Sequence, residues 1–77
     1  MHASKANVMV DVKQVLGRES SDELITELGG IPGVSRASVS SRAPRLVLVD
    51  YDPDVTDSQR ILGAVVRHGI DARLVGM

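Results

Sequence analysis

The stretch RLVLVDY, residues 45–51, is the clearest β-strand of this chain, and the rest of the fold can be built around it. It is short and dense in β-branched and aliphatic residues, which favours a strand over a helix. Valines alternate with other side chains over 7–13, the period of two that indicates a strand with one buried face. The stretch 34–41 predicts another strand, joined to 45–51 by a hairpin at 41–44, and the short apolar stretch 70–75 predicts an edge strand.

The first helix is predicted to begin at Ser20. Ser20 can cap the free backbone amides of a helix start, and Glu23, three residues later, can reach back to it, which is the spacing of a capping box. Gly29 and Gly30 are expected to end the helix, because glycine permits the left-handed exit of the backbone.

A second helix is predicted over 57–68. Thr56 and Gln59 repeat the capping-box spacing, an apolar stripe follows, and Gly69 offers the terminating position. The element order is therefore βαββαβ. Two right-handed crossovers place both helices on one face of a four-stranded antiparallel sheet, which is a ferredoxin-like α+β fold.

The composition predicts one folded domain over 1–77, with residues 1–6 as a flexible tail. Hydrophobic residues make up 43% of the chain, charged residues 25%, and the net charge is -1. The basic residues are scattered, so no nucleic-acid partner is expected. No apolar run approaches the roughly 20 residues that span a bilayer, so membrane insertion is not expected. A cytoplasmic location is expected instead. No nucleophile can be placed beside a base, so neither catalytic residues nor enzymatic activity are expected.

Several short motifs occur in a characteristic order along the chain. They are IPGV at 31–34, VDYDP at 49–53 and GIDA at 69–72, together with Leu28 before the first of them and with Ala37 and Val39 after it. In this order the sequence resembles the heavy-metal-associated (HMA) domain of copper chaperones and of metal-pumping P-type ATPases. The resemblance covers nearly the whole chain and implies the same ferredoxin-like fold and a link to metal transport.

The resemblance fails at the metal-binding loop. The HMA family carries a GMxCxxC loop before the first helix, whose two thiolates bind soft metal ions, because soft ions require soft ligands. This chain has no cysteine, and Gly17 and Ser20 stand at the two cysteine positions. The resemblance therefore implies a variant without the CxxC motif and without a thiolate-bound cofactor.

His2 and His68 are the only imidazoles of the chain and the remaining weak candidates for metal ligands. Metal sites usually need three or four convergent ligands, so a transition metal would have to recruit carboxylates as well. The simpler interpretation of His68 is that it completes the last turn of the second helix, where positive charge is favourable.

An apolar patch is predicted on the sheet face that the helices leave uncovered. If the valines at alternate positions face the helices, then Met9, Leu46, Leu48 and Val75 project from the opposite face. Contiguous apolar patches of this kind mark partner surfaces. The alternative is a register shifted by one residue, which would turn some of these side chains inward.

Three functional hypotheses follow. The leading one is a non-enzymatic module, linked to metal homeostasis, that docks to another protein or forms a homodimer. By resemblance the expected partner is a metal-handling protein. The second is metal binding through histidine and carboxylate ligands instead of cysteine. The third is a regulatory domain that senses a small ligand bound between subunits.

Overall fold

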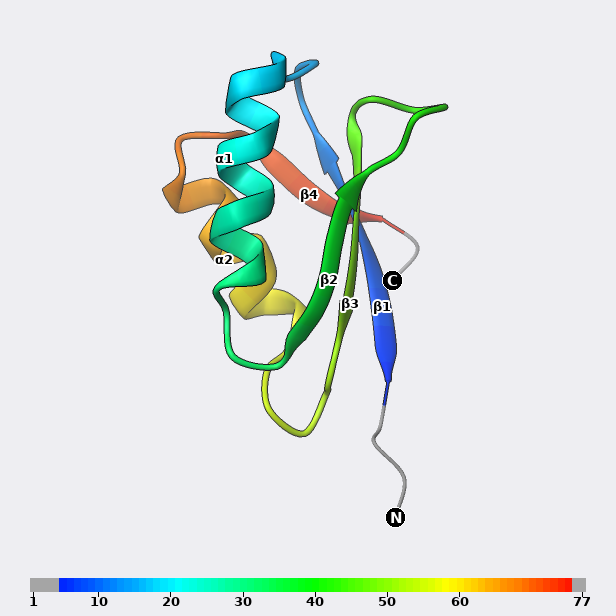
Figure 1. Ribbon diagram of the computed structural model, residues 1–77, viewed down its shortest axis with the longest axis vertical. Helices are drawn as coiled ribbons and strands as arrows, with labels where there is room; N and C mark the ends of the chain where they lie inside the picture. The colour runs from blue at the N-terminus through cyan, green and yellow to red at the C-terminus, as the bar shows by residue number, and fades with distance from the viewer. Residues whose placement is uncertain (1–4, 76–77) are drawn as a thin grey trace.

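Six elements follow one another in the order βαββαβ in the computed structural model, which describes residues 5–75. They are β1 (Ala6–Val12), α1 (Arg18–Gly29), β2 (Val34–Val39), β3 (Leu46–Tyr51), α2 (Ser58–Arg67) and β4 (Ala72–Val75). The strands form one antiparallel sheet in the order β2-β3-β1-β4, and both helices lie on the same face of it (Figure 1). The predicted ferredoxin-like α+β fold is confirmed.

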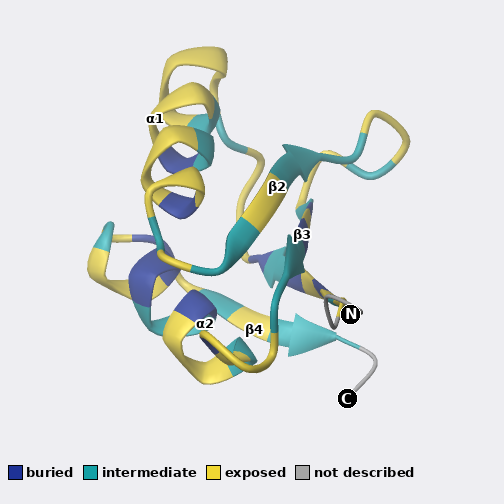
Figure 2. Cartoon of the chain, turned by 60° about the horizontal axis from the view of Figure 1, so that its bottom comes forward, coloured by how far each residue is buried: buried dark blue, intermediate teal, exposed yellow. Residues whose placement is uncertain are grey.

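The core lies between the sheet and the two helices (Figure 2). Its fully or almost fully buried members are Val8, Val10 and Val12 from β1, Val47 and Val49 from β3, Leu24 and Leu28 from α1, Ile61, Ala64 and Val65 from α2, and Ile70 before β4. The strand members recur at every second position because successive side chains of a strand point to opposite faces. The alternation predicted for 7–13 and 45–51 is therefore confirmed.

Helix α1 begins earlier than predicted. Its N-cap is Gly17, no side chain caps it, and Ser20 lies exposed inside the helix. The amide of Ser21 already donates a helical hydrogen bond of 2.8 Å to the carbonyl of Gly17. A capping serine needs an extended backbone, and a helix that began at Ser20 would lose the hydrogen bond between Ser21 and Gly17. The prediction that Ser20 caps this helix is therefore wrong.

The left-handed exit expected at the end of α1 is also absent at the predicted position. Gly30 has a right-handed backbone with φ -82°, and its amide donates to the carbonyls of Thr26 and Glu27. The backbone turns to positive φ later, at Gly33 with φ 96°. The last turn of α1 therefore closes with ordinary helical geometry. The change of the backbone to positive φ takes place at Gly33, directly before β2.

Helix α2 occupies the predicted range but uses a different cap. The Arg60 amide donates to Asp57 Oδ1 at 2.8 Å, so Asp57 and not Thr56 is the N-cap. Thr56 is 5% exposed, and its Oγ1 has no hydrogen-bond partner among the described residues. Gly69, with φ 88°, ends the helix as predicted.

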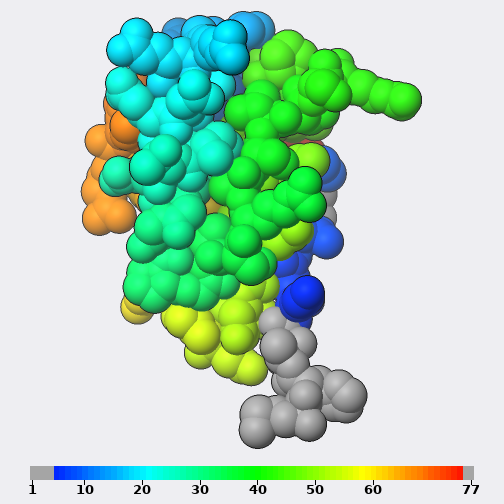
Figure 3. All heavy atoms as spheres, viewed as in Figure 1, coloured from blue at the N-terminus to red at the C-terminus, as the bar shows by residue number. Residues whose placement is uncertain are grey.

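Strands β2 and β4 are each two residues shorter than predicted. β2 ends at Val39 because Ser40 starts the turn, where its hydroxyl accepts a hydrogen bond of 3.2 Å from the Ala43 amide. The resulting hairpin between β2 and β3 projects from the body of the molecule (Figure 3). β4 begins at Ala72. Ile70, where the predicted strand began, is a buried core residue that precedes the strand.

Candidate functional site

The segment between β1 and α1 lies where the resemblance to the HMA domain predicts the metal loop. Gly17 ends this segment as the N-cap of α1, and Ser20 lies one turn further along the helix. A side chain at position 17 would be free of steric conflict, because a Cβ built on Gly17 meets nothing within 4 Å. The loop therefore has room for a ligand at this position, but glycine and serine provide no soft donor, so these residues do not fit a soft cation.

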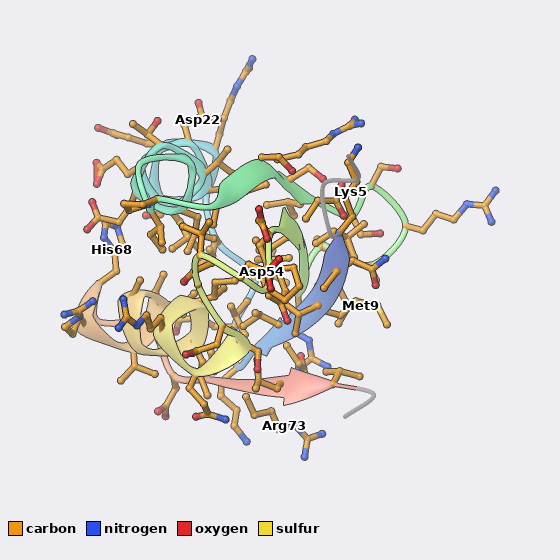
Figure 4. All side chains as sticks on the ribbon, turned by 90° about the horizontal axis from the view of Figure 1, so that it is seen from below. Lys5, Met9, Asp22, Asp54, His68 and Arg73 are labelled. Carbon is orange, nitrogen blue, oxygen red and sulfur yellow. The ribbon has the colours of Figure 1, made fainter. Side chains whose placement is uncertain are left out.

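His68 is the one histidine that lies within residues 5–75; His2 falls outside the described residues. His68 is the C-cap residue of α2, and its Nε2 lies 4.0 Å from Glu23 Oε2 of α1 (Figure 4). Within the described part of the chain, no group of three or more histidine or acidic side chains is placed to hold a metal ion. One imidazole beside one carboxylate falls short of the usual ligand number.

The open sheet face carries the four apolar residues that the sequence placed there. Met9 of β1 lies opposite Leu48 of β3 and opposite Val75 of β4, while Leu46 lies opposite the neighbouring Asp11. Met9 is 39% and Leu48 38% exposed, and Leu46 and Val75 are half-buried. We call these four residues the sheet-face patch. The alternative register, shifted by one residue, does not occur.

Charges of both signs flank the sheet-face patch. Arg73 Nε lies 3.5 Å from Asp11 Oδ2, on neighbouring strands β4 and β1. On the other side, Arg36 of β2 lies opposite Asp50 of β3. A surface ion pair such as that of Arg73 and Asp11 adds little stability but can orient a partner. The patch is thus an apolar centre with a polar rim, the usual anatomy of a protein interface.

A second surface feature was missed in the sequence analysis. A groove runs between α1 and α2 on the side away from the sheet, and Gly63 and Val66 lie along it. Its α1 wall carries Glu19, Asp22, Glu23 and Glu27, and its α2 wall carries Arg60, Arg67 and His68. The signal was present, because the acidic residues of α1 recur every three or four positions and so share one helical face. Which helix faces which could only be decided by the fold.

The fold matches several solved structures at low sequence identity. Oxidized MerP from Ralstonia metallidurans superposes with a TM-score of 0.82 at 18% identity, over 94% of this chain and 99% of that one. The N-terminal domain of a potential copper-translocating P-type ATPase from Bacillus subtilis gives 0.81 at 22% identity, over 92% and 88%. A putative copper-ion-binding protein from Bacillus anthracis gives 0.82 at 17% identity, over 94% and 100%.

These similarities establish the fold. No model of a known protein family matches the sequence, and no curated protein matches it. The structural neighbours nevertheless include the HMA domains of copper chaperones and P-type ATPases, as the motifs around IPGV at 31–34 predicted. The chain therefore has the HMA fold without the two cysteines of the CxxC motif.

Proposed function

We propose that this chain is a non-enzymatic docking module with the HMA fold, and that it binds a metal-handling protein through the sheet-face patch. The observation that carries the proposal is the patch itself. Met9 lies between Leu48 and Val75 on a face that the helices leave uncovered, and the apolar side chains of that face remain partly open to solvent. A cytoplasmic location is part of this proposal.

Metal carriage by this chain is disfavoured by ligand chemistry. A soft cation such as copper(I) is held and passed on by thiolates, and positions 17 and 20 carry glycine and serine. The second hypothesis, binding through harder ligands, would use His68, whose nearest described carboxylate is Glu23 at 4.0 Å. Two donors at that separation make a poor site.

The non-catalytic role and the partner class rest on the fold. Structurally similar chains include a CopZ metallochaperone and a copper-binding domain of a P-type ATPase. Within residues 5–75 neither helix is long and apolar enough to span a membrane. A domain of this fold that has lost its own ligands can still contact a protein that handles metal.

Site-specific crosslinking tests the proposed docking face. A photoreactive residue at position 48 should capture a metal-handling protein in cells, whereas the same residue at position 55 should not, because Val55 is 51% exposed but lies on the turn before α2. In a chain with the photoreactive residue at position 9, the substitution Leu48→Asp should abolish the capture. Val55→Asp in the same chain is the matched control and should leave the capture unchanged. Capture of the same proteins from positions 48 and 55 would refute the proposal.

Calorimetric titration tests the competing metal hypothesis. Copper(I), copper(II), zinc and iron should each fail to bind the full chain tightly at a stoichiometric ratio. Should one of them bind with a micromolar or lower Kd that is lost in His68→Ala, the chain would be a metal carrier with non-thiolate ligands.

A further inference from the structure

We propose that a second copy of this chain packs on the groove between the helices, with α1 of each copy against α2 of the other. This inference goes beyond the proposed docking function, because it concerns the opposite side of the molecule. The helices cover one face of the sheet (Figure 1), and the sheet-face patch lies on the other, where Figure 4 labels Met9. A dimer formed through the groove would leave both patches free for the partner.

The two walls of the groove carry opposite charges that are mostly unpaired across it. Of the acidic residues on α1 and the basic residues on α2, only Glu23 and His68 approach within 4.0 Å of each other among the described residues. Arg60 and Arg67 form no ion pair within residues 5–75. Arg18, at the beginning of α1, is the one basic residue on the acidic wall. Each wall therefore retains charge that a partner surface can complement.

The arrangement of the charges selects a second copy as that partner. If the two-fold axis runs along the groove, α1 of each copy lies opposite α2 of the other copy. The acidic wall of each copy then contacts the basic wall of the other, so the favourable pairing occurs twice. An axis across the groove would instead set α1 against α1 and α2 against α2, which brings like charges together. The first arrangement is isologous, as a two-fold dimer requires. Complementary potentials of this kind fix the register of an interface and suppress wrong pairings.

The heights of the charged residues along the groove agree with that axis. The contact between Glu23 and His68 places the end of α2 level with the middle of α1. Arg67 is therefore near the level of Glu23, and Arg60, about two helical turns earlier, is nearer the end of α1 that carries Glu27. A rotation about an axis along the groove preserves these levels, so each arginine faces an acidic residue of the other copy.

Gly63 supports close approach at the centre of the groove. It lies inside α2, where glycine is a poor helix former, and a Cβ built on it would meet nothing within 4 Å. Among residues 5–75, no neighbouring atom requires a glycine at this position. Beside it, Val66 is 49% exposed, and both residues line the groove. A missing side chain next to an exposed apolar one suits a surface that a second helix approaches.

Charge reversal with mixing tests the dimer. Sedimentation of wild type should show a dimer whose Kd rises with salt. The variants Glu23→Lys/Glu27→Lys and Arg60→Glu/Arg67→Glu should each raise that Kd by about tenfold or more, because like charges then meet on both seams. Mixed in equal amounts, the two variants should associate with each other. The control Arg42→Glu/Arg45→Glu changes the net charge by the same amount as Arg60→Glu/Arg67→Glu, but on the hairpin between β2 and β3. It should leave the Kd unchanged.

Gly63→Ala gives a second readout that a purely structural role would not produce. It should raise the melting temperature of the monomeric variant Arg60→Glu/Arg67→Glu, since alanine is the better helix former, yet raise the dimer Kd in the wild-type background. Leu48→Asp should not change that Kd, which separates the groove from the sheet-face patch.

Three results would overturn the inference. The first is a wild-type chain that stays monomeric up to about 1 mM, the range of the weakest specific association. The second is a dimer that survives both charge reversals, or reversed variants that are folded by circular dichroism but do not associate when mixed. The third is a dimer that Leu48→Asp dissociates, which would place self-association on the sheet face.

Discussion

Gly33→Ala should destabilise the fold more than the same change at Gly69. Both glycines have positive φ, 96° at Gly33 and 88° at Gly69, so alanine introduces backbone strain of about 1–2 kcal/mol at either. Only Gly33 is also crowded. A Cβ there would lie 2.9 Å from both Cβ and Cγ1 of Val55 and 3.1 Å from Cγ2 of Thr56. Overpacking of that kind adds about 1–3 kcal/mol.

The expected loss of unfolding free energy is therefore about 2–5 kcal/mol for Gly33→Ala and about 1–2 kcal/mol for Gly69→Ala. Urea denaturation followed by circular dichroism measures both, provided that the slope of free energy against urea stays constant. The protein should be dilute, so that association does not contribute to the measured stability.

A double-mutant cycle separates the steric part from the strain. Val55→Gly removes both of the atoms at 2.9 Å. Because Val55 is 51% exposed, the unfolding free energy lost through Val55→Gly itself should be modest, and it cancels in the cycle. Gly33→Ala should then cost much less in the Val55→Gly background. Equal costs at Gly33 and Gly69, or no recovery in the double variant, would refute the reasoning.

Three further changes test the caps and the core. Asp57→Ala should cost about 1 kcal/mol in urea denaturation and Ser20→Ala close to nothing, because only Asp57 caps a helix; the reverse order would contradict the assignment. Thr56→Val should raise thermal stability by about 1 kcal/mol by removing a buried hydroxyl without a described partner, and a lower melting temperature would show that the hydroxyl is bonded. Leu28→Ala should cost about 2–5 kcal/mol in urea denaturation, whereas Leu48→Ala, at a site 38% exposed, should cost clearly less; equal losses would contradict the assigned faces.

The strands were predictable because their signal is local. The alternation that begins at Val8 and the dense run at 45–51 each specify a face as well as an element, and both faces match the structure. The sheet-face patch could be predicted for the same reason, since residues between the buried valines must point the other way. Its role as a docking surface stays a prediction.

The helix starts were less predictable because several polar residues at each start can serve as a cap. Ser20 and Thr56 both had the capping-box spacing, yet the structure uses Gly17 and Asp57. Helix α1 already begins before Ser20, because the Ser21 amide donates to the carbonyl of Gly17. At the start of α2, the carboxylate of Asp57 accepts the hydrogen bond from the Arg60 amide. A carboxylate is a better acceptor than the hydroxyl of Thr56, because its hydrogen bond is charge-assisted.

The sequence by itself determined the chemical limits of this protein and the local geometry of its strands. It contains no thiolate, and its valines recur with the period of a strand that has one buried face. Only the tertiary structure decided which side chains from different elements lie beside one another. It set Met9 between Leu48 and Val75 and placed the acidic face of α1 beside the basic face of α2. The physical reason is that periodicity acts over a few neighbouring residues, whereas these contacts join segments far apart in the chain, which only the crossovers bring together.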